Sequence, residues 1–220
     1  MAHSTAVALL AAAALIACGA AQAKQSSRLV TAEMRGHALE NAQRLDWARS
    51  AQENARNLAA PWLNVSDEDL WKMIPSQELP RAVFIARGIL YEGKKDACPK
   101  CGGAISYGGK TDFWKQDWKV TCSHCNDVYP KNDFMAYYKT ALDEHGCFRR
   151  GKGDEKLLFN AGHPDPNDPL HKLYVDDGYG MTDETGQVHH VIAYYAYIHW
   201  NKIMTGARDL AWAYALTGEP

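Results

Sequence analysis

The sequence predicts a mainly helical protein into which a small metal-binding β-structure is inserted. Residues 27–60 are rich in Ala, Arg, Glu, Gln and Leu and contain no proline, a composition that favours helix. Residues 192–216 again have helical character and carry aromatic side chains along their length. Between these segments, four cysteines form two Cys-x-x-Cys pairs, at residues 98–101 and 122–125. That spacing is typical of a four-thiolate zinc ribbon.

The predicted metal is a structural zinc ion. A two-residue gap lets both sulfurs of a pair reach one ion at about 2.3 Å, and the second pair completes a closed tetrahedron. Gly102 and Gly103 suit the tight turn after the first pair. Two disulfides are the alternative, because an exported protein meets oxidising conditions. The predicted ligands are Cys98, Cys101, Cys122 and Cys125.

Residues 1–23 have the features of an export signal. They carry no acidic or basic side chain, and the apolar block at residues 7–17 is too short to span a bilayer as a mature helix. Ala21-Gln22-Ala23 fits signal cleavage, whereas Leu15-Ile16-Ala17-Cys18 resembles a bacterial lipobox. We therefore expect an exported protein that is periplasmic, secreted or an outer-membrane lipoprotein. Contact with a membrane is expected only through a lipid anchor at Cys18.

The first half of the mature chain contains two predicted helices. Residues 27–60 form one long amphipathic helix, which Pro61 ends. Ser66 and the three acidic residues after it cap a second, short helix, because a hydroxyl and negative charge both stabilise the amino-terminal end. Pro75 stops that helix.

The second half contains two further helical segments. Residues 134–142 form a short helix, and residues 192–216 form a longer one that Gly206 divides or kinks. Cys147 stands apart from the other cysteines, and we expect it to be a buried, unpaired thiol.

Two short antiparallel β-structures are predicted. Residues 173–175 pair with residues 188–191 across a glycine-containing turn at residues 183–186. The strand residues of the cysteine ribbon are Trp114, Trp118, Val120 and Thr121.

The charge distribution bears on possible partners. The net charge of −2 provides no overall attraction for a polyanion, but residues 81–152 carry 13 basic and 8 acidic side chains. This excess fits either a solvated lysine-rich face or contact with an acidic polymer. A cytosolic ribbon would suit nucleic acid, but the export signal argues against a nucleic-acid partner.

Several segments occur in a particular order along the chain: WLNVSDEDLW (62–71), the cysteine pairs, YPKND (129–133), NAGHPD (160–165), VDDGYG (175–180) and IAYY (192–195). Together they resemble exported bacterial proteins of the heparinase II/III-like family. The resemblance covers about residues 60–220, and the order of the motifs carries more weight than any one of them.

The resemblance implies the start of an incomplete (α/α) toroid and polysaccharide lyase chemistry on a uronic acid polymer. Such a lyase cuts by β-elimination, so its partner is an acidic polysaccharide. The implied organisation is a signal peptide at 1–23, a helical segment at 24–92, the zinc ribbon at 93–133 and the truncated toroid domain at 134–220. The catalytic residues are expected beyond Pro220, and the fragment alone is expected to be inactive.

Side chains that could contact sugar, by ring stacking or charge, are Arg149, Tyr179, Tyr194 and Trp200. No catalytic residue is assigned, since the aromatic face of residues 192–216 suits core packing. Trp62 and Trp71 are predicted to lie in the core. Two alternatives remain: a non-catalytic exported carbohydrate-binding or scaffold protein, and a zinc-ribbon binding module.

Overall fold

The computed structural model describes residues 29–83, 85, 98–103 and 111–219, and these are mainly helical, as predicted. The chain divides into two compact units, one formed by residues 1–57 with 211–220 and the other by residues 58–210. The predicted signal and Cys18 lie outside the described residues. Within the described part, no helix combines the length and the apolar character needed to cross a membrane.

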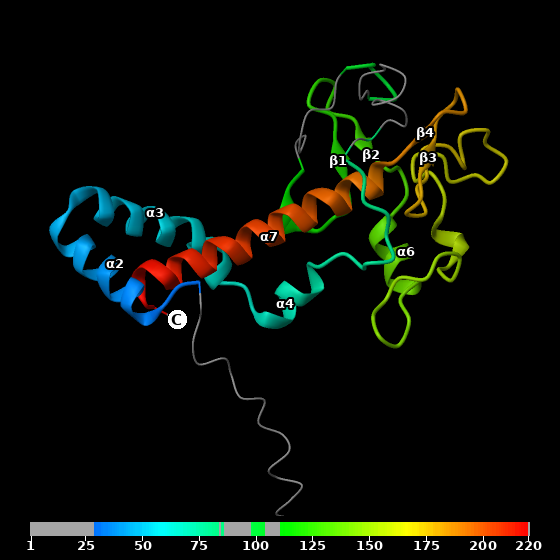
Figure 1. The fold of residues 1–220 in the computed structure, drawn as a ribbon. Helices are drawn as coiled ribbons and strands as arrows, with labels where there is room; N and C mark the ends of the chain where they lie inside the picture. Colours follow the sequence, from blue (N-terminus) through cyan, green and yellow to red (C-terminus); the bar gives the residue numbers. More distant parts are fainter. Residues whose placement is uncertain (1–28, 84, 86–97, 104–110, 220) are drawn as a thin grey trace, which may run out of the picture. The chain divides into compact units, whose positions relative to one another are not determined.

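The first unit is helical, and its helices begin and end differently from the prediction (Figure 1). The single helix expected at residues 27–60 is wrong: the structure has α2 (Ala32–Arg44) and α3 (Asp46–Leu63). Leu45, between them, is extended, with φ −125° and ψ 124°. Pro61 lies inside the last turn of α3 and does not end it. Near a helix end a proline removes one hydrogen bond, and the remaining turn tolerates that loss.

The last turns of α7 (Val191–Thr217) complete the first unit. The Gln52 side-chain amide donates to the Leu216 carbonyl oxygen over 2.5 Å. Arg56 forms an ion pair with Glu219 at 3.0 Å. Four alanines of this unit are buried: Ala42, Ala48, Ala55 and Ala215.

Two helices of the second unit have side-chain caps at their amino-terminal ends, and the Ser66 cap was predicted. In α4 (Asp67–Lys72), the Ser66 hydroxyl accepts a hydrogen bond from the N–H of Asp69 at 3.1 Å. In α6 (Phe134–Thr140), the Asp133 carboxylate accepts from the N–H of Ala136 at 3.0 Å. Each cap satisfies one of the backbone donors that a helix start leaves unpaired.

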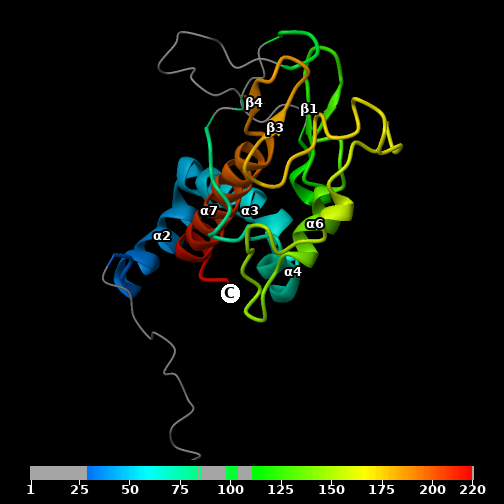
Figure 2. The same ribbon diagram turned by 90° about the vertical axis from the view of Figure 1, so that its right-hand side faces the viewer.

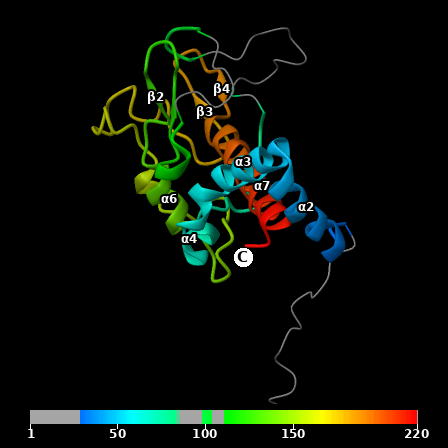
Figure 3. The same cartoon turned by 90° about the vertical axis from the view of Figure 1, so that its left-hand side faces the viewer.

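Two short hairpins complete the second unit and lie at the same end of it (Figures 2 and 3). In the first, β1 (Val120–Thr121) pairs antiparallel with β2 (Val128–Tyr129). In the second, β3 (Met181–Thr182) pairs antiparallel with β4 (Val188–His189). The turn at residues 183–186 is where we expected it.

The strand predictions outside these hairpins are wrong. Residues 173–175 do not form a strand, because Tyr174 has a φ of +63° and interrupts an extended chain. Trp114 lies in the 3-10 helix η1 (Phe113–Lys115), and Trp118 has a φ of +55°. A second 3-10 turn, η2 (Glu155–Leu157), precedes the loop to β3.

Helix α7 is continuous through Gly206, so the predicted division into two helices there is wrong. The glycine has a packing role instead: a Cβ at this position would lie 2.3 Å from the Trp62 ring. Trp62 is buried, as predicted, but Trp71 is 78% exposed, which corrects its assignment to the core. The main core of the second unit is aromatic, and Trp118 stacks on Tyr195 with ring centres 5.0 Å apart.

Candidate metal centre and binding clefts

The two cysteine pairs fold into two turns that resemble each other closely. In the first, the N–H of Gly102 donates to the carbonyl oxygen of Cys98 over 2.9 Å, and in the second, Asn126 donates to Cys122 over 3.0 Å. Gly102 and Asn126 occupy equivalent places and have φ values of +64° and +61°. This left-handed conformation suits glycine and asparagine better than other residues. We call each turn a knuckle: residues 98–103 form the first, and residues 122–127 the second.

The knuckles bring four sulfur atoms together, each within 4.8 Å of the others. The sulfurs of Cys98 and Cys125 are 3.7 Å apart, and those of Cys101 and Cys122 are 3.8 Å apart. A tetrahedral ion with four metal–sulfur bonds of about 2.3 Å would separate its sulfurs by roughly 3.8 Å. The cluster could therefore bind a metal, and its thiols are free rather than joined in disulfides. No second such group of His, Cys, Asp or Glu occurs among the described residues.

The local environment acts on these thiols in two opposite directions, through backbone donors and through burial. The N–H of Gly103 points at the Cys101 sulfur over 3.4 Å, and the N–H of His124 points at the Cys122 sulfur over 3.4 Å. Such donors stabilise negative charge on sulfur. Burial raises the pKa of the Cys98 thiol to about 12. Metal binding must therefore displace a proton from Cys98, and metal affinity should fall as pH falls.

Three segments that are far apart in the sequence meet beside the knuckles. The N–H of Lys131 donates to the carbonyl oxygen of Tyr174 over 2.7 Å, and the N–H of Ala161 donates to the carbonyl oxygen of Lys131 over 3.3 Å. The buried Asn132 side chain donates to the Asp176 carbonyl oxygen and accepts from the Asp176 N–H, each over 3.0 Å. The motifs at residues 129–133, 160–165 and 175–180 thus form one connected structure.

The buried carboxylate of Asp176 joins this structure to α7. One of its oxygens accepts from the N–H groups of Gly178 (2.8 Å) and Gly180 (3.1 Å), and the other accepts from Ile192 (3.1 Å). Burial raises the pKa of Asp176 to about 6, against the effect of these three hydrogen bonds. The carboxylate therefore fixes the first turn of α7 against the loop at residues 176–180.

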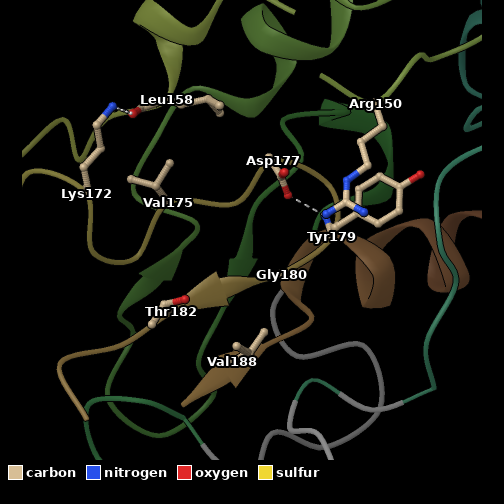
Figure 4. A pocket seen from close by; sticks show the side chains of 9 residues that line it. All are labelled: Arg150, Leu158, Lys172, Val175, Asp177, Tyr179, Gly180, Thr182 and Val188. Atoms are coloured by element: carbon tan, nitrogen blue, oxygen red, sulfur yellow. Dashed lines mark hydrogen bonds between the residues drawn. The ribbon is translucent and has the colours of Figure 1, made fainter. Parts of the chain in front are cut away.

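One cleft, of about 360 Å³, opens beside Tyr179, and we call it the Tyr179 cleft (Figure 4). The guanidinium of Arg150 lies over the Tyr179 ring, 3.9 Å from its centre. Lys172 also faces the cleft, and its ammonium donates to the Leu158 carbonyl oxygen over 2.8 Å. Asp177 is the carboxylate of the lining, so the lining carries two positive charges and one negative charge. Among the described residues, Arg150 forms no ion pair.

A second cleft, of about 560 Å³, lies beside the first knuckle, and we call it the knuckle cleft. Pro99 and Lys100 of the knuckle form part of its lining. The rest of the lining comes from Asp127 of the second knuckle, from Tyr129 and Lys131, from residues of the loop at 160–174, and from Glu184.

The structure separates the four predicted sugar contacts. Tyr179 lies in the cleft that bears its name. Arg149 lines neither cleft, because Asp143 binds its guanidinium over 2.8 Å. Tyr194 is only 1% exposed, so its assignment as a sugar contact is wrong: its ring is part of the core. Trp200 is half-buried beneath the Arg81 guanidinium, 4.5 Å from its ring centre, and also lies outside both clefts.

Sequence reasoning missed Arg150, Lys100 and His163 as lining residues. Arg150 follows Arg149 directly, and no pattern in the sequence shows which of the two arginines turns towards Tyr179. His163 offered a signal, because it lies in the NAGHPD segment that contributed to the family resemblance.

Comparison with known protein families, with curated proteins and with solved structures finds no match for the chain. The resemblance to heparinase II/III-like proteins therefore remains a prediction from the motifs and their order.

Proposed function

We propose that this chain is the amino-terminal part of an exported polysaccharide lyase and that it binds the uronic acid polymer through the Tyr179 cleft. In this proposal the four cysteines form a ribbon around a structural zinc ion, and the helices belong to the start of an (α/α) toroid. A closed thiolate site leaves no coordination position for water or substrate, so zinc supplies stability rather than chemistry.

The observation that carries the proposal is the guanidinium of Arg150, which forms no ion pair with any residue that the structure describes. Its plane packs against the Tyr179 ring, and the Tyr179 hydroxyl donates to the Glu78 carbonyl oxygen over 3.2 Å. The ring is thus fixed at both its face and its hydroxyl. An arginine held in this way can form two parallel hydrogen bonds to a carboxylate, with less loss of side-chain entropy than a free arginine. Polymers made only of uronic acid, such as polygalacturonate, present one carboxylate per sugar.

The reaction that the family resemblance implies depends on neutralising that carboxylate. A base removes the C5 proton, its electron pair forms the C4–C5 double bond, and the C4–O bond breaks. The leaving oxygen takes up a proton. A cation bound to the neighbouring carboxylate stabilises the negative charge that develops during proton removal. The proposal gives Arg150 a binding role and places the base outside this chain.

The binding step is tested with two neighbouring arginines. We expect Arg150→Ala to weaken binding of polygalacturonate by about 10-fold or more, because a charged hydrogen bond contributes roughly 1.5–3 kcal/mol. Arg149→Ala removes the same charge one residue away and should leave affinity within about twofold, since its partner Asp143 is solvent-accessible. Isothermal titration calorimetry on the zinc-bound protein measures both. Equal affinities of Arg150→Ala and the unmodified protein would place the site elsewhere.

The lyase step needs the product of the complete reading frame. Incubation with uronic acid polymers should produce an unsaturated sugar, which the ultraviolet absorbance of its new double bond reports. If the polymer binds but no unsaturated product forms at any pH, the non-catalytic carbohydrate-binding alternative replaces the lyase.

A nucleic-acid role for the ribbon has less support from the structure. Lys119, one of the basic residues of this region, turns inward and donates to the carbonyl oxygens of Pro130 and Asn132, each over 2.6 Å. Desolvation lowers its pKa. Its ammonium therefore stabilises the fold beside the ribbon instead of extending a phosphate-binding surface.

A further inference from the structure

The knuckle cleft is lined by residues from both cysteine knuckles and from the loop at residues 160–174. Its volume of about 560 Å³ lies within the range of small-ligand sites. Pro99 and Lys100, which line it, stand between two predicted metal ligands, Cys98 and Cys101. The loop at residues 160–174 supplies much of the remaining lining. The side chains of this lining divide into those that are already paired and those that are not.

Two of the carboxylates in the lining are already engaged. Asp127 accepts from the Lys131 ammonium over 2.7 Å and from the Tyr129 hydroxyl over 2.6 Å. Glu184 accepts from the Tyr174 hydroxyl over 3.3 Å through one oxygen. The charge of Lys131 is therefore balanced within the protein, and Glu184 keeps one oxygen available to accept a hydrogen bond.

Lys100 and His163 supply the remaining groups of the lining that could bind a ligand. The Lys100 ammonium forms no hydrogen bond or close ion pair with a described residue, and its attraction to the Asp127 carboxylate is a longer-range electrostatic one. The ring of His163 is bound on one side, where its Nδ1 lies 2.8 Å from the Asp168 carboxylate. No described residue is bonded to the other ring nitrogen, Nε2, and the side chain is 37% exposed.

Asp168 determines which nitrogen of His163 carries the proton. Its other oxygen accepts from the N–H of Leu170 over 2.8 Å. This bond and the one from His163 lower the pKa of Asp168, so the carboxylate remains ionised and Nδ1 of His163 is the donor to it. Nε2 is then free to accept a hydrogen bond from a hydroxyl group, or to donate one when the ring is protonated.

We propose that the knuckle cleft binds a sugar that carries a carboxylate, with Lys100 pairing with the carboxylate and His163 and Glu184 binding neighbouring hydroxyls. The assignment of a uronate as this sugar rests on the proposed function; the geometry itself requires a carboxylate next to hydroxyl groups. The cleft thereby provides a second binding site in addition to the Tyr179 cleft.

The paired state of the lining argues against other ligand classes. A cation would need several free carboxylate oxygens. Asp127 is already bound to Lys131 and Tyr129, and Glu184, the other carboxylate among the lining residues, has one oxygen bound to Tyr174. A neutral sugar would leave the Lys100 ammonium without a partner once the ligand covered it, and a buried unpaired charge is costly. A carboxylate removes that cost.

The test uses two ligands that have the same hydroxyl groups and different charge. Digalacturonate and its methyl ester have the same hydroxyl groups, and the ester removes the negative charge. We expect calorimetry on the zinc-bound protein to show at least about 10-fold weaker binding of the ester, which corresponds to about 1.4 kcal/mol. Lys100→Ala should weaken binding of the acid to the level of the ester and leave the ester unaffected. His163→Ala should weaken binding of both ligands.

Two controls make the outcome decisive. Lys139→Ala removes an exposed lysine from α6 and should leave both affinities unchanged. Arg150→Ala alters the Tyr179 cleft and should retain Lys100-dependent binding of the disaccharide. If Arg150→Ala keeps polymer affinity while Lys100→Ala loses disaccharide affinity, only the proposed function of the Tyr179 cleft fails. Equal binding of acid and ester, or unchanged binding in both Lys100→Ala and His163→Ala, overturns the knuckle cleft proposal.

Discussion

At the scale of single residues, Asn132 shows how one buried amide joins two motifs. Its side chain pairs with both the N–H and the carbonyl oxygen of Asp176, 44 positions along the chain. The Asn132 amide thus satisfies both buried backbone groups of Asp176, the N–H and the carbonyl oxygen. Removing it therefore exposes two buried backbone groups to an environment without partners.

We expect Asn132→Ala to lower the free energy of unfolding by about 2–4 kcal/mol, because each unsatisfied buried group costs roughly 1–3 kcal/mol. Urea denaturation, followed by fluorescence, measures the change. Asn167→Ala is the matched control: Asn167 is exposed and bonds only within its own turn, to Asp165. A similar loss in both variants would show that Asn132 has no special role.

The hairpin between β3 and β4 contains a buried pair with a defined pH dependence. The Asp183 carboxylate lies 2.8 Å from Nε2 of His189 and also accepts from Thr185 and Gln187. Burial opposes ionisation, but these hydrogen bonds outweigh it and lower the pKa of Asp183 to about 2. A lowered pKa stabilises the folded state above the unfolded value of about 3.9, and this stabilisation is lost as pH falls towards 2.

The expected size of this contribution is about 2 kcal/mol at neutral pH. Asp183→Asn should therefore be less stable than the unmodified protein by about that amount at pH 5–7, and the difference should shrink towards pH 2. Urea denaturation of both proteins across this range tests the prediction. Because any loss of metal at low pH affects both proteins, the difference between them isolates Asp183. A difference that grows on acidification would contradict the assignment.

Features of single residues could be predicted from the sequence where they depend only on neighbouring residues. The Ser66 cap and the turn at residues 183–186 depend on neighbouring residues alone, and both were predicted. Arg149 and Arg150 have the same chemistry and adjacent positions, so only the packed structure distinguishes the one beside Asp143 from the one over Tyr179.

At the scale of elements, Gly206 and Gly36 illustrate two uses of glycine in a helix. Gly206 lies in α7 against the Trp62 ring, whereas nothing lies within 4 Å of a Cβ at Gly36 in α2. Sequence alone gives both the same helix-weakening tendency. The predicted break at Gly206 was wrong because the close contact with Trp62 stabilises a continuous helix.

The same substitution should therefore have opposite effects at the two glycines. Gly206→Ala should lower the free energy of unfolding by about 1–3 kcal/mol, since the added methyl overlaps the Trp62 ring. Gly36→Ala should raise it by up to about 1 kcal/mol through helix propensity. Thermal denaturation by circular dichroism compares the two. Stabilisation by both substitutions would mean that Trp62 does not pack against Gly206.

At the scale of the whole molecule, the cysteine cluster and the aromatic core of the second unit are one structure. Cys98 and Cys122 are buried in the same core as Trp118 and Tyr195. The knuckles could be predicted from spacing, because the four cysteines lie close in sequence. The meeting of the motifs around residues 131, 161 and 176 could not, because it depends on hydrogen bonds between distant segments.

We expect the purified protein to hold one zinc ion per chain and Cys98→Ser to lose it, with a fall in melting temperature. Binding energy at a site that forms only in the folded chain adds to folding stability. Cys147→Ser is the control, because Cys147 is free and lies outside the cluster. Native mass spectrometry reports the ion, and circular dichroism reports melting. Masses that show two disulfides and no ion would exclude the zinc centre.

The position of Lys100 between Cys98 and Cys101 has a consequence for the proposed ligand and the ion together. A side chain that belongs to a metal knuckle and also lines a cleft couples two equilibria, because an ion that orders the knuckle also orders the lining. The two effects are then equal: if bound zinc raises the affinity for the sugar by some factor, bound sugar raises the affinity for zinc by the same factor. At equilibrium, saturation with digalacturonate should accordingly reduce the fraction of zinc that a competing chelator removes.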